Sequence, residues 1–163
     1  MSGIEIIRCN FDIPLHCNAV VKLMKAYMTD VMGGRQPLDN AGNKNLISGL
    51  KNHPAAFTLL AKYGTNFVGL TNSFINFSTF DARNFLNIHD LIVLTSYRGK
   101  GIGKLLLEKN IRIAEEELGC SKITLEVRND NTLAKALYKS LGFKDTTPPM
   151  HFWFRPLPTD SRE

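Results

Sequence analysis

The sequence predicts a single α/β domain over residues 1–163, with a mixed (α+β) central sheet and helices on both of its faces. A chain of 163 residues with 44% hydrophobic and 21% charged residues can bury a sizeable core. Two strand-like segments, residues 86–94 and 122–127, flank a helical pattern over residues 102–118. A succession of strand, helix and strand places its two strands parallel. A hairpin signal earlier in the chain adds antiparallel strands, so the sheet is expected to be mixed.

The N-terminal third predicts one strand and two helices. Residues 4–9 form a strand-like run, and Asp12 and Pro14 resemble a helix start. Apolar residues at helical spacing then indicate a buried helix face: Val20, Leu23, Met24 and Tyr27. Residues 33–45 are polar and glycine-rich, which predicts either a mobile loop near a substrate entrance or a plain surface connection. A short helix containing Leu46, Ile47 and Leu50 follows, and it ends before Pro54.

The middle of the chain supplies the central strands. Residues 57–62 and 67–77 are strand-like, with a hairpin turn at Tyr63-Gly64-Thr65-Asn66. The run 91–94 is continuously apolar, as expected for a strand covered on both faces. The helix over residues 102–118 has an apolar stripe with steps of three or four, which predicts packing on the sheet: Gly103, Leu107, Ile111, Ala114 and Leu118.

The C-terminal part predicts one helix and two closing strands. Asn131 can cap the helix, and Gly142 can end it. The apolar residues of the helix share one face: Ala134, Leu137, Tyr138 and Leu141. Residues 143–145 and 151–154 are the expected strands, separated by Pro148-Pro149.

Composition and charge narrow the function classes. The net charge of +5 fits an anionic coenzyme better than nucleic acid, since long Lys/Arg runs are absent. No apolar run approaches the roughly 20 residues of a membrane span, and the first residues do not resemble a signal peptide. Cys9, Cys17 and Cys120 have no metal-ligand spacing. We therefore expect a cytoplasmic protein with reduced thiols, no metal and no membrane partner.

The segment Arg98-Gly99-Lys100-Gly101-Ile102-Gly103-Lys104 joins the expected strand at 86–94 to the helix at 102–118. Its three glycines allow close approach of the backbone to a ligand, and the helix start offers unpaired N–H groups. Arg98, Lys100 and Lys104 add positive charge. Together these features predict a pyrophosphate cradle for a nucleotide or a coenzyme.

The cradle departs from two common phosphate loops. Leu105 follows Lys104, so the Walker pattern fails, and Lys104 occupies the place of the last glycine of a dinucleotide fingerprint. The segment fits R-x-x-G-x-G instead. A second motif follows, which reads Asn131-x-x-Ala134-x-x-Leu137-Tyr138-x-x-x-Gly142-Phe143. These two motifs together resemble the GNAT family of N-acetyltransferases, over roughly residues 57–155. Residues 89–103 are most similar to the diamine (spermidine/spermine) acetyltransferase branch.

The resemblance implies the GNAT acyl-CoA N-acyltransferase fold and direct transfer of acetyl from acetyl-CoA to a primary amine. The amine would belong to a small molecule, polyamine-like or amino-acid-like, and a homodimer is expected. By the same resemblance, the coenzyme-binding residues are Leu91, Ile92, Val93, Arg98, Gly99, Lys100, Gly101, Ile102, Gly103, Lys104, Asn131, Ala134 and Tyr138. At least one of Arg98 and Lys104 is expected to meet a phosphate.

Two side chains are candidates for proton transfer. Tyr138 stands where the family commonly has a tyrosine that donates a proton to the CoA sulfur, although it also fits a core tyrosine. His89 replaces a glutamate of the diamine branch and is the candidate base, although it also fits a half-buried strand residue. Asp90 or water is the alternative base. Strand alternation predicts that Asp90 faces away from His89.

Three other readings remain open at this stage. A non-catalytic module that binds acyl-CoA would use the same fold, because fold does not establish chemistry. A peptide or protein N-acetyltransferase would use the same cradle. The positive charge by itself is also compatible with a nucleic-acid-binding protein.

Overall fold

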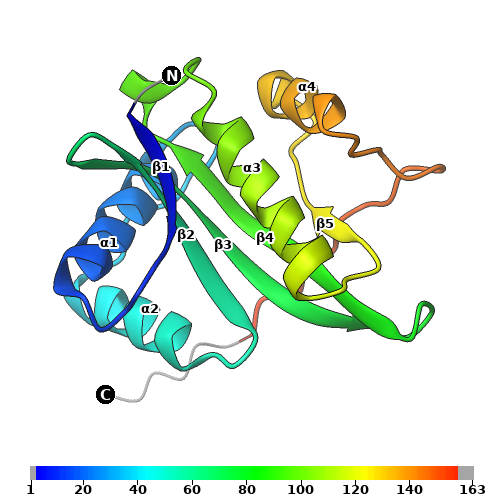
Figure 1. The fold of residues 1–163 in the computed structure, drawn as a ribbon, viewed down its shortest axis with the longest axis horizontal. Coiled ribbons are helices and arrows are strands. Elements are labelled where there is room, and N and C mark those ends of the chain that lie inside the picture. Colours follow the sequence, from blue (N-terminus) through cyan, green and yellow to red (C-terminus); the bar gives the residue numbers. More distant parts are fainter. Residues whose placement is uncertain (1–2, 158–163) are drawn as a thin grey trace. The chain divides into compact units, whose positions relative to one another are not determined.

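The mixed sheet is present in the computed structural model, which describes residues 3–157 (Figure 1). Its five strands follow the order of the sequence: β1 (Ile4–Arg8), β2 (Ala56–Tyr63), β3 (Asn66–Ser78), β4 (Arg83–Val93) and β5 (Ile123–Leu125). Strands β1 to β4 pair antiparallel, whereas β5 pairs with β4 in parallel. This confirms the predicted fold class and the parallel pair.

The chain divides after Asn131 into two compact units, and the sheet belongs to the first. The second contains α4 (Thr132–Ser140). Each unit is described by itself below, and the single domain over 1–163 stays a prediction. None of the helices within residues 3–157 combines the length and apolar character needed to cross a membrane.

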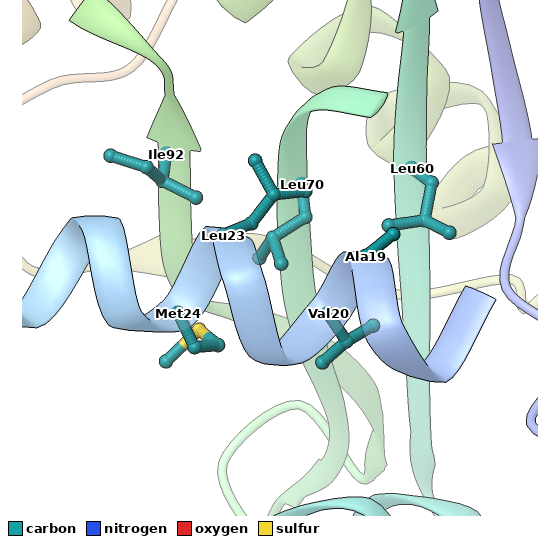
Figure 2. Close-up of a cluster of buried hydrophobic side chains, with 7 residues drawn as sticks. All are labelled: Ala19, Val20, Leu23, Met24, Leu60, Leu70 and Ile92. Atoms are coloured by element: carbon teal, nitrogen blue, oxygen red, sulfur yellow. The ribbon is translucent and has the colours of Figure 1, made fainter. Parts of the chain in front are cut away.

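Helices cover both faces of the sheet in the first unit. On one face, α1 (Pro14–Thr29) buries four side chains against Leu60, Leu70 and Ile92 from three strands, as Figure 2 shows. Apolar residues of α2 (Asn40–Asn52) pack against the same cluster. On the other face, α3 (Ile102–Arg112) packs on a second cluster that contains Leu59 and Val68. Neighbouring residues Leu59 and Leu60 thus point to opposite faces, which explains the continuous apolar runs of the central strands.

The observed start of α1 agrees with the sequence prediction, whereas that of α2 differs from it. Helix α1 has its proline at the first turn, as predicted. Helix α2 begins at Asn40, so the predicted loop over residues 33–45 is too long. The reason is a cap, because the Asp39 side chain accepts a hydrogen bond of 2.7 Å from the Gly42 N–H.

The residues that α3 buries differ from the apolar stripe predicted from the sequence. Helix α3 continues into a π-helical turn at Ile113–Glu117. The predicted stripe is partly wrong, because Gly103, Ile111 and Leu118 are only half-buried. The buried residues of the two helical segments are Ile102, Leu106, Leu107, Asn110, Ile113 and Ala114. The buried face includes the polar residue Asn110, which an apolar pattern cannot identify.

Asn110 links α3 to β3 through a buried network of hydrogen bonds. Its amide nitrogen donates to Thr71 Oγ1 and to the Leu106 carbonyl, both at 2.9 Å. Its amide oxygen accepts from Ser73 Oγ at 2.8 Å. The side chains of Thr71, Ser73 and Asn110 are all buried, so each polar group depends on the others for its partner.

The second unit departs most from the sequence expectations. Helix α4 lies where it was predicted, but residues 143–145 and 151–154 are not strands, so that prediction is wrong. Three prolines of this segment, Pro148, Pro149 and Pro156, lack the N–H that a strand ladder requires. In the first unit, strand β5 is shorter than the predicted strand over residues 122–127.

The Asn110 network gives a first prediction. Asn110→Ala should lower the free energy of unfolding by about 1–3 kcal/mol, because it leaves two buried hydroxyls without their partner. Urea denaturation followed by circular dichroism measures the change. Asn45→Ala, an exposed position of α2, is the matched control and should shift stability by less than about 0.5 kcal/mol. Equal effects of the two substitutions would contradict a structural role for the network.

Candidate active site

Strand β4 contains a β-bulge at His89. Along β3, Asn72 pairs with Asp90 and the next residue, Ser73, pairs with Ile88. His89 is therefore the extra residue of β4 at this point. Bulges occur next to active sites because they redirect side chains and bend the strand.

The bulge places His89 and Asp90 on the same face of the sheet. The His89 ring meets the Phe74 ring edge to face, with centroids 5.6 Å apart. The Asn72 amide nitrogen donates to Asp90 Oδ2 at 2.9 Å. Because Asn72 and Phe74 are two residues apart on β3, their side chains share one face. The expectation that Asp90 faces away from His89 is wrong, since simple alternation does not hold across the extra residue.

This shared face is the one that α1 covers. The Asn72 amide nitrogen lies 3.4 Å from the Met24 sulfur, and the Thr58 hydroxyl donates to Asn72 Oδ1 at 2.6 Å. Asn72 is fully enclosed by these contacts, which fixes the orientation of the Asp90 carboxylate. The role of Asn72 could not be predicted from the sequence, because a single polar residue inside an apolar strand forms no recognisable pattern.

Tyr27 of α1 belongs to the same neighbourhood. Burial raises the pKa of Tyr27, and the negative charges of Asp90 and Asp30 raise it further. Its phenol therefore stays protonated and neutral at physiological pH. The sequence indicated a core residue at this position, and the structure adds two carboxylates near its hydroxyl.

Beyond the bulge, β4 leaves its parallel partner. Strand β5 pairs with Leu86, Asn87 and Ile88, and β4 then continues to Val93. Leu91, Ile92 and Val93, the residues predicted to hold the pantetheine arm, lie in this continuation, paired with β3 on the other side. The Val93 carbonyl accepts a hydrogen bond of 3.0 Å from Arg98 Nε.

The predicted cradle forms at the start of α3. Gly99 and Gly101 have φ of 74° and 78°, a conformation that favours glycine. A Cβ added at either position would point into open space, with no atom within 4 Å. Gly101 is the N-cap of α3 and offers no side-chain cap to the first N–H groups of the helix. An open glycine turn before uncapped amides fits a diphosphate, which would be held by the backbone from Gly99 to Lys104.

Each cation of the cradle has a contact within the chain. Arg98 forms an ion pair of 2.8 Å with Asp30, and Lys104 lies 3.8 Å from Glu108. The Lys100 ammonium lies over the rings of Tyr63 and Tyr97, at 5.4 and 5.1 Å from their centroids. A phosphate contact for Arg98 or Lys104 therefore stays a prediction, and Arg98 would have to leave Asp30 or be shared with it.

Asp30 connects α1 to this loop. Its carboxylate accepts hydrogen bonds from the Met32 N–H at 3.0 Å and from Arg98 at 2.8 Å. These two bonds lower the pKa of Asp30 below its ordinary value. The end of α1, the start of the following loop and the cradle are thus joined through one carboxylate.

The remaining predicted residues are Asn131, the last residue of the first unit, and Ala134 and Tyr138 of α4 in the second unit. The Asn131 N–H donates to the Arg128 carbonyl at 3.0 Å. Within the second unit, Ala134 and Tyr138 are half-buried on one face of α4. The Tyr138 ring lies 5.9 Å from that of Phe143, and the Tyr138 carbonyl accepts from the Leu141 and Phe143 N–H groups. Each of these contacts lies within one unit, so the roles of Asn131, Ala134 and Tyr138 stay predictions.

The described residues also include cysteine thiols and other potential metal ligands. Burial raises the pKa of Cys9 to about 12, with a further contribution from Cys17, and burial also raises the pKa of Cys120. These two thiols therefore stay protonated at physiological pH. The described residues contain no group of three or more His, Cys, Asp or Glu side chains placed to hold a metal ion.

Comparison with known proteins decides the family. The profile of the acetyltransferase (GNAT) family matches residues 22–143, which is most of the chain. The chain belongs to the GNAT acetyltransferase family. The predicted family, fold and enzyme class are thereby confirmed.

Individual relatives share moderate or low sequence identity with the chain. A thialysine N-epsilon-acetyltransferase from Bos taurus is 38% identical over 80 residues, which cover 49% of this chain and 46% of that protein. The chain thus aligns with about half the length of this curated relative. A possible acetyltransferase from Clostridium difficile 630 has a TM-score of 0.79 at 20% identity, with 97% and 100% of the two chains covered. An aminoglycoside N-acetyltransferase in complex with CoA has a TM-score of 0.75 at 17% identity, with 94% of each chain covered. At these identities the two structures show the fold.

The cradle gives a second prediction. Gly101→Asp should weaken acetyl-CoA binding by about tenfold or more, because its carboxylate would stand against the phosphates while Asp tolerates positive φ. Isothermal titration calorimetry measures the affinity. Gly119→Asp, at a positive-φ glycine beyond the far end of the helix, is the matched control and should bind normally. Normal affinity of the Gly101 variant would show that the cradle is elsewhere.

The Asp30 carboxylate gives a third prediction, on pH. Because its folded-state pKa is lowered, ionised Asp30 stabilises the fold above the ordinary aspartate pKa of about 3.9, and this contribution is lost as the pH falls through the lowered value. Asp30→Asn should therefore unfold at lower urea than the wild type at neutral pH and converge with it in acid.

The control for this experiment is Glu116→Gln, which removes an exposed carboxylate. It should show little change at either pH. A deficit of Asp30→Asn that is equal at all pH values would mean that the side chain acts through packing and not through its charge.

Proposed function

We propose that the chain is an acetyl-CoA-dependent N-acetyltransferase that transfers acetyl directly to a primary amine of a small molecule. The observation that carries the proposal is the bulge at His89. It places His89 and Asp90 together on one face, beside the stretch of β4 that leads to the glycine cradle. A homodimer, expected from the family resemblance, and a cytoplasmic location, expected from the sequence, are also part of the proposal.

The backbone would bind and orient the coenzyme. N–H groups from Gly99 to Lys104, with Ile102 at the first helical position, would hold the diphosphate, because the turn is open and the helix N-terminus attracts anions. Backbone groups of Leu91 to Val93 would hold the pantetheine arm along the part of β4 beyond its pairing with β5. Asn131 and Ala134 are proposed as further contacts. When bound, acetyl-CoA would supply a thioester whose acyl carbon accepts the amine and whose sulfur leaves as a thiolate.

The side chains would move protons. His89 is exposed on the bulge and is proposed to take a proton from the amine, directly or through water. Asp90 becomes a stronger alternative base than the sequence suggested, because it shares the face of His89 and its Oδ2 is held by Asn72. Tyr138 is proposed to donate a proton to the leaving sulfur. Burial keeps Cys9 and Cys120 protonated, which disfavours either thiol as an acyl-accepting nucleophile and supports direct transfer over an intermediate on these two residues.

An assay of the wild-type protein tests the proposal. Purified protein is incubated with acetyl-CoA and a panel of small amines and peptides, and both free thiol and the acetylated product are measured. Amine-dependent thiol release with an acetylated small amine is the expected result. Binding of acetyl-CoA without transfer would favour a non-catalytic module, and transfer to peptides alone would favour a peptide N-acetyltransferase. Salt-sensitive binding to nucleic acid that acetyl-CoA does not affect would instead favour a nucleic-acid-binding protein.

The acid assignment gives a fourth prediction. Tyr138→Phe keeps the ring but removes the hydroxyl, so kcat should fall by about 10²-fold while the affinity for acetyl-CoA stays unchanged. Steady-state kinetics and calorimetry measure the two quantities. Tyr63→Phe, at an exposed tyrosine, is the control for the loss of a hydroxyl. An unchanged kcat in the Tyr138 variant would assign the proton donor to another group.

A further inference from the structure

Three aromatic rings from different elements meet on the face that carries His89 and Asp90. Phe74 of β3 lies between two imidazoles. The His53 ring is 5.1 Å from Phe74 at an interplanar angle of 81°, and the His89 ring is 5.6 Å away at 89°. His53 is the C-cap residue of α2, far in sequence from the bulge. The end of α2 therefore reaches the same ring that contacts the bulged residue.

The hydrogen bonding of His53 defines what this imidazole can recognise. Its Nδ1 accepts a hydrogen bond of 3.2 Å from the Ala55 N–H. In the neutral ring the proton is then on Nε2, so the side chain presents an N–H donor. His53 is an exposed residue, and its donor can bind a carboxylate of a ligand.

The charges near the bulge point to a substrate with one positive centre. Asp90 is a carboxylate held in place by Asn72, and it can bind an ammonium group. Asp30 is already paired with Arg98. The two side chains that flank Phe74 are imidazoles and not carboxylates, so a second ammonium placed beside them would gain no counter-ion there.

Resting on the proposed function, we infer that His53 selects the acceptor amine. The acceptor class is an amino-acid-like primary amine. Its ammonium group would bind at Asp90, and a carboxylate at its other end would accept a hydrogen bond from the His53 N–H. Diamines of the same length, whose far end is a second ammonium, are the disfavoured class. Phe74 supports the His53 ring by edge-to-face contact and fixes its direction.

Matched substrates test this inference. The probes are ω-amino carboxylates and α,ω-diamines with three, four or five methylene groups, compared at equal chain length and neutral pH. The wild type should show a kcat/KM for the better amino carboxylate about two- to fivefold above that of the matched diamine, as expected for one partly exposed charged contact. Equal or higher values for the diamines would overturn the inference.

Variants of His53 test its role. His53→Glu should lower the amino carboxylate to diamine ratio by about fivefold or more, because a negative charge now attracts the second ammonium. His53→Gln keeps a neutral donor and should retain most of the ratio. Circular dichroism and acetyl-CoA binding show whether each variant is folded. An unchanged ratio in folded His53→Glu would overturn the role of His53.

Failure of the two proposals can be told apart. If acetyl-CoA binds and no amine is acetylated, the proposed function falls and the inference falls with it. If amines are acetylated but the diamines react as well as the matched amino carboxylates, the proposed function stands and the inference alone is overturned.

Discussion

The extra residue in β4 is the constraint on which the candidate active site depends. Pairing of Asn72 with Asp90 and of Ser73 with Ile88 leaves His89 without a partner in the ladder. A regular strand would send the side chains of His89 and Asp90 to opposite faces of the sheet. The bulge instead brings both to the face covered by α1, and β4 runs on past its pairing with β5 towards the cradle. One inserted residue therefore arranges both the polar side chains and the strand edge beside them.

Polar residues inside the sheet stabilise this arrangement from both sides. Asn72 faces α1, where it orients Asp90 and contacts Met24 and Thr58. Thr71 and Ser73, its neighbours in sequence, face the other way and bond to Asn110 of α3. Three successive residues of β3 thus carry hydrogen bonds to opposite layers at the point where the register shifts. Buried polar groups of this kind must be satisfied by specific partners, so they favour one register over its alternatives.

Much of the first unit could be predicted from sequence because its signals are local. Hydrophobic period, glycine at turns and proline at a helix start locate the strands and helices within a few residues. The cradle was also visible, because its glycines lie between a strand and a helix, and the residues Gly99 and Gly101 do adopt positive φ.

What could not be predicted depends on pairing between distant segments. The bulge at His89, the ring contact with His53 and the Asp30–Arg98 pair exist only once strands and helices have met. The predicted strands 143–145 and 151–154 did not form for a different reason, since the prolines between and after them lack the N–H that a strand ladder requires.

The Asn110 network has a consequence for ligand affinity. Contacts between apolar side chains allow a helix to slide or turn slightly on a sheet, whereas hydrogen bonds are directional and fix both its rotation and its height. Asn110 fixes α3 in this way about two and a half turns after Gly101, the residue from which the helix starts. The amide groups at that helix start are therefore fixed relative to the sheet, as the proposed diphosphate site requires. A rigid set of donors loses little entropy when it is occupied, so binding free energy is not spent on ordering the protein.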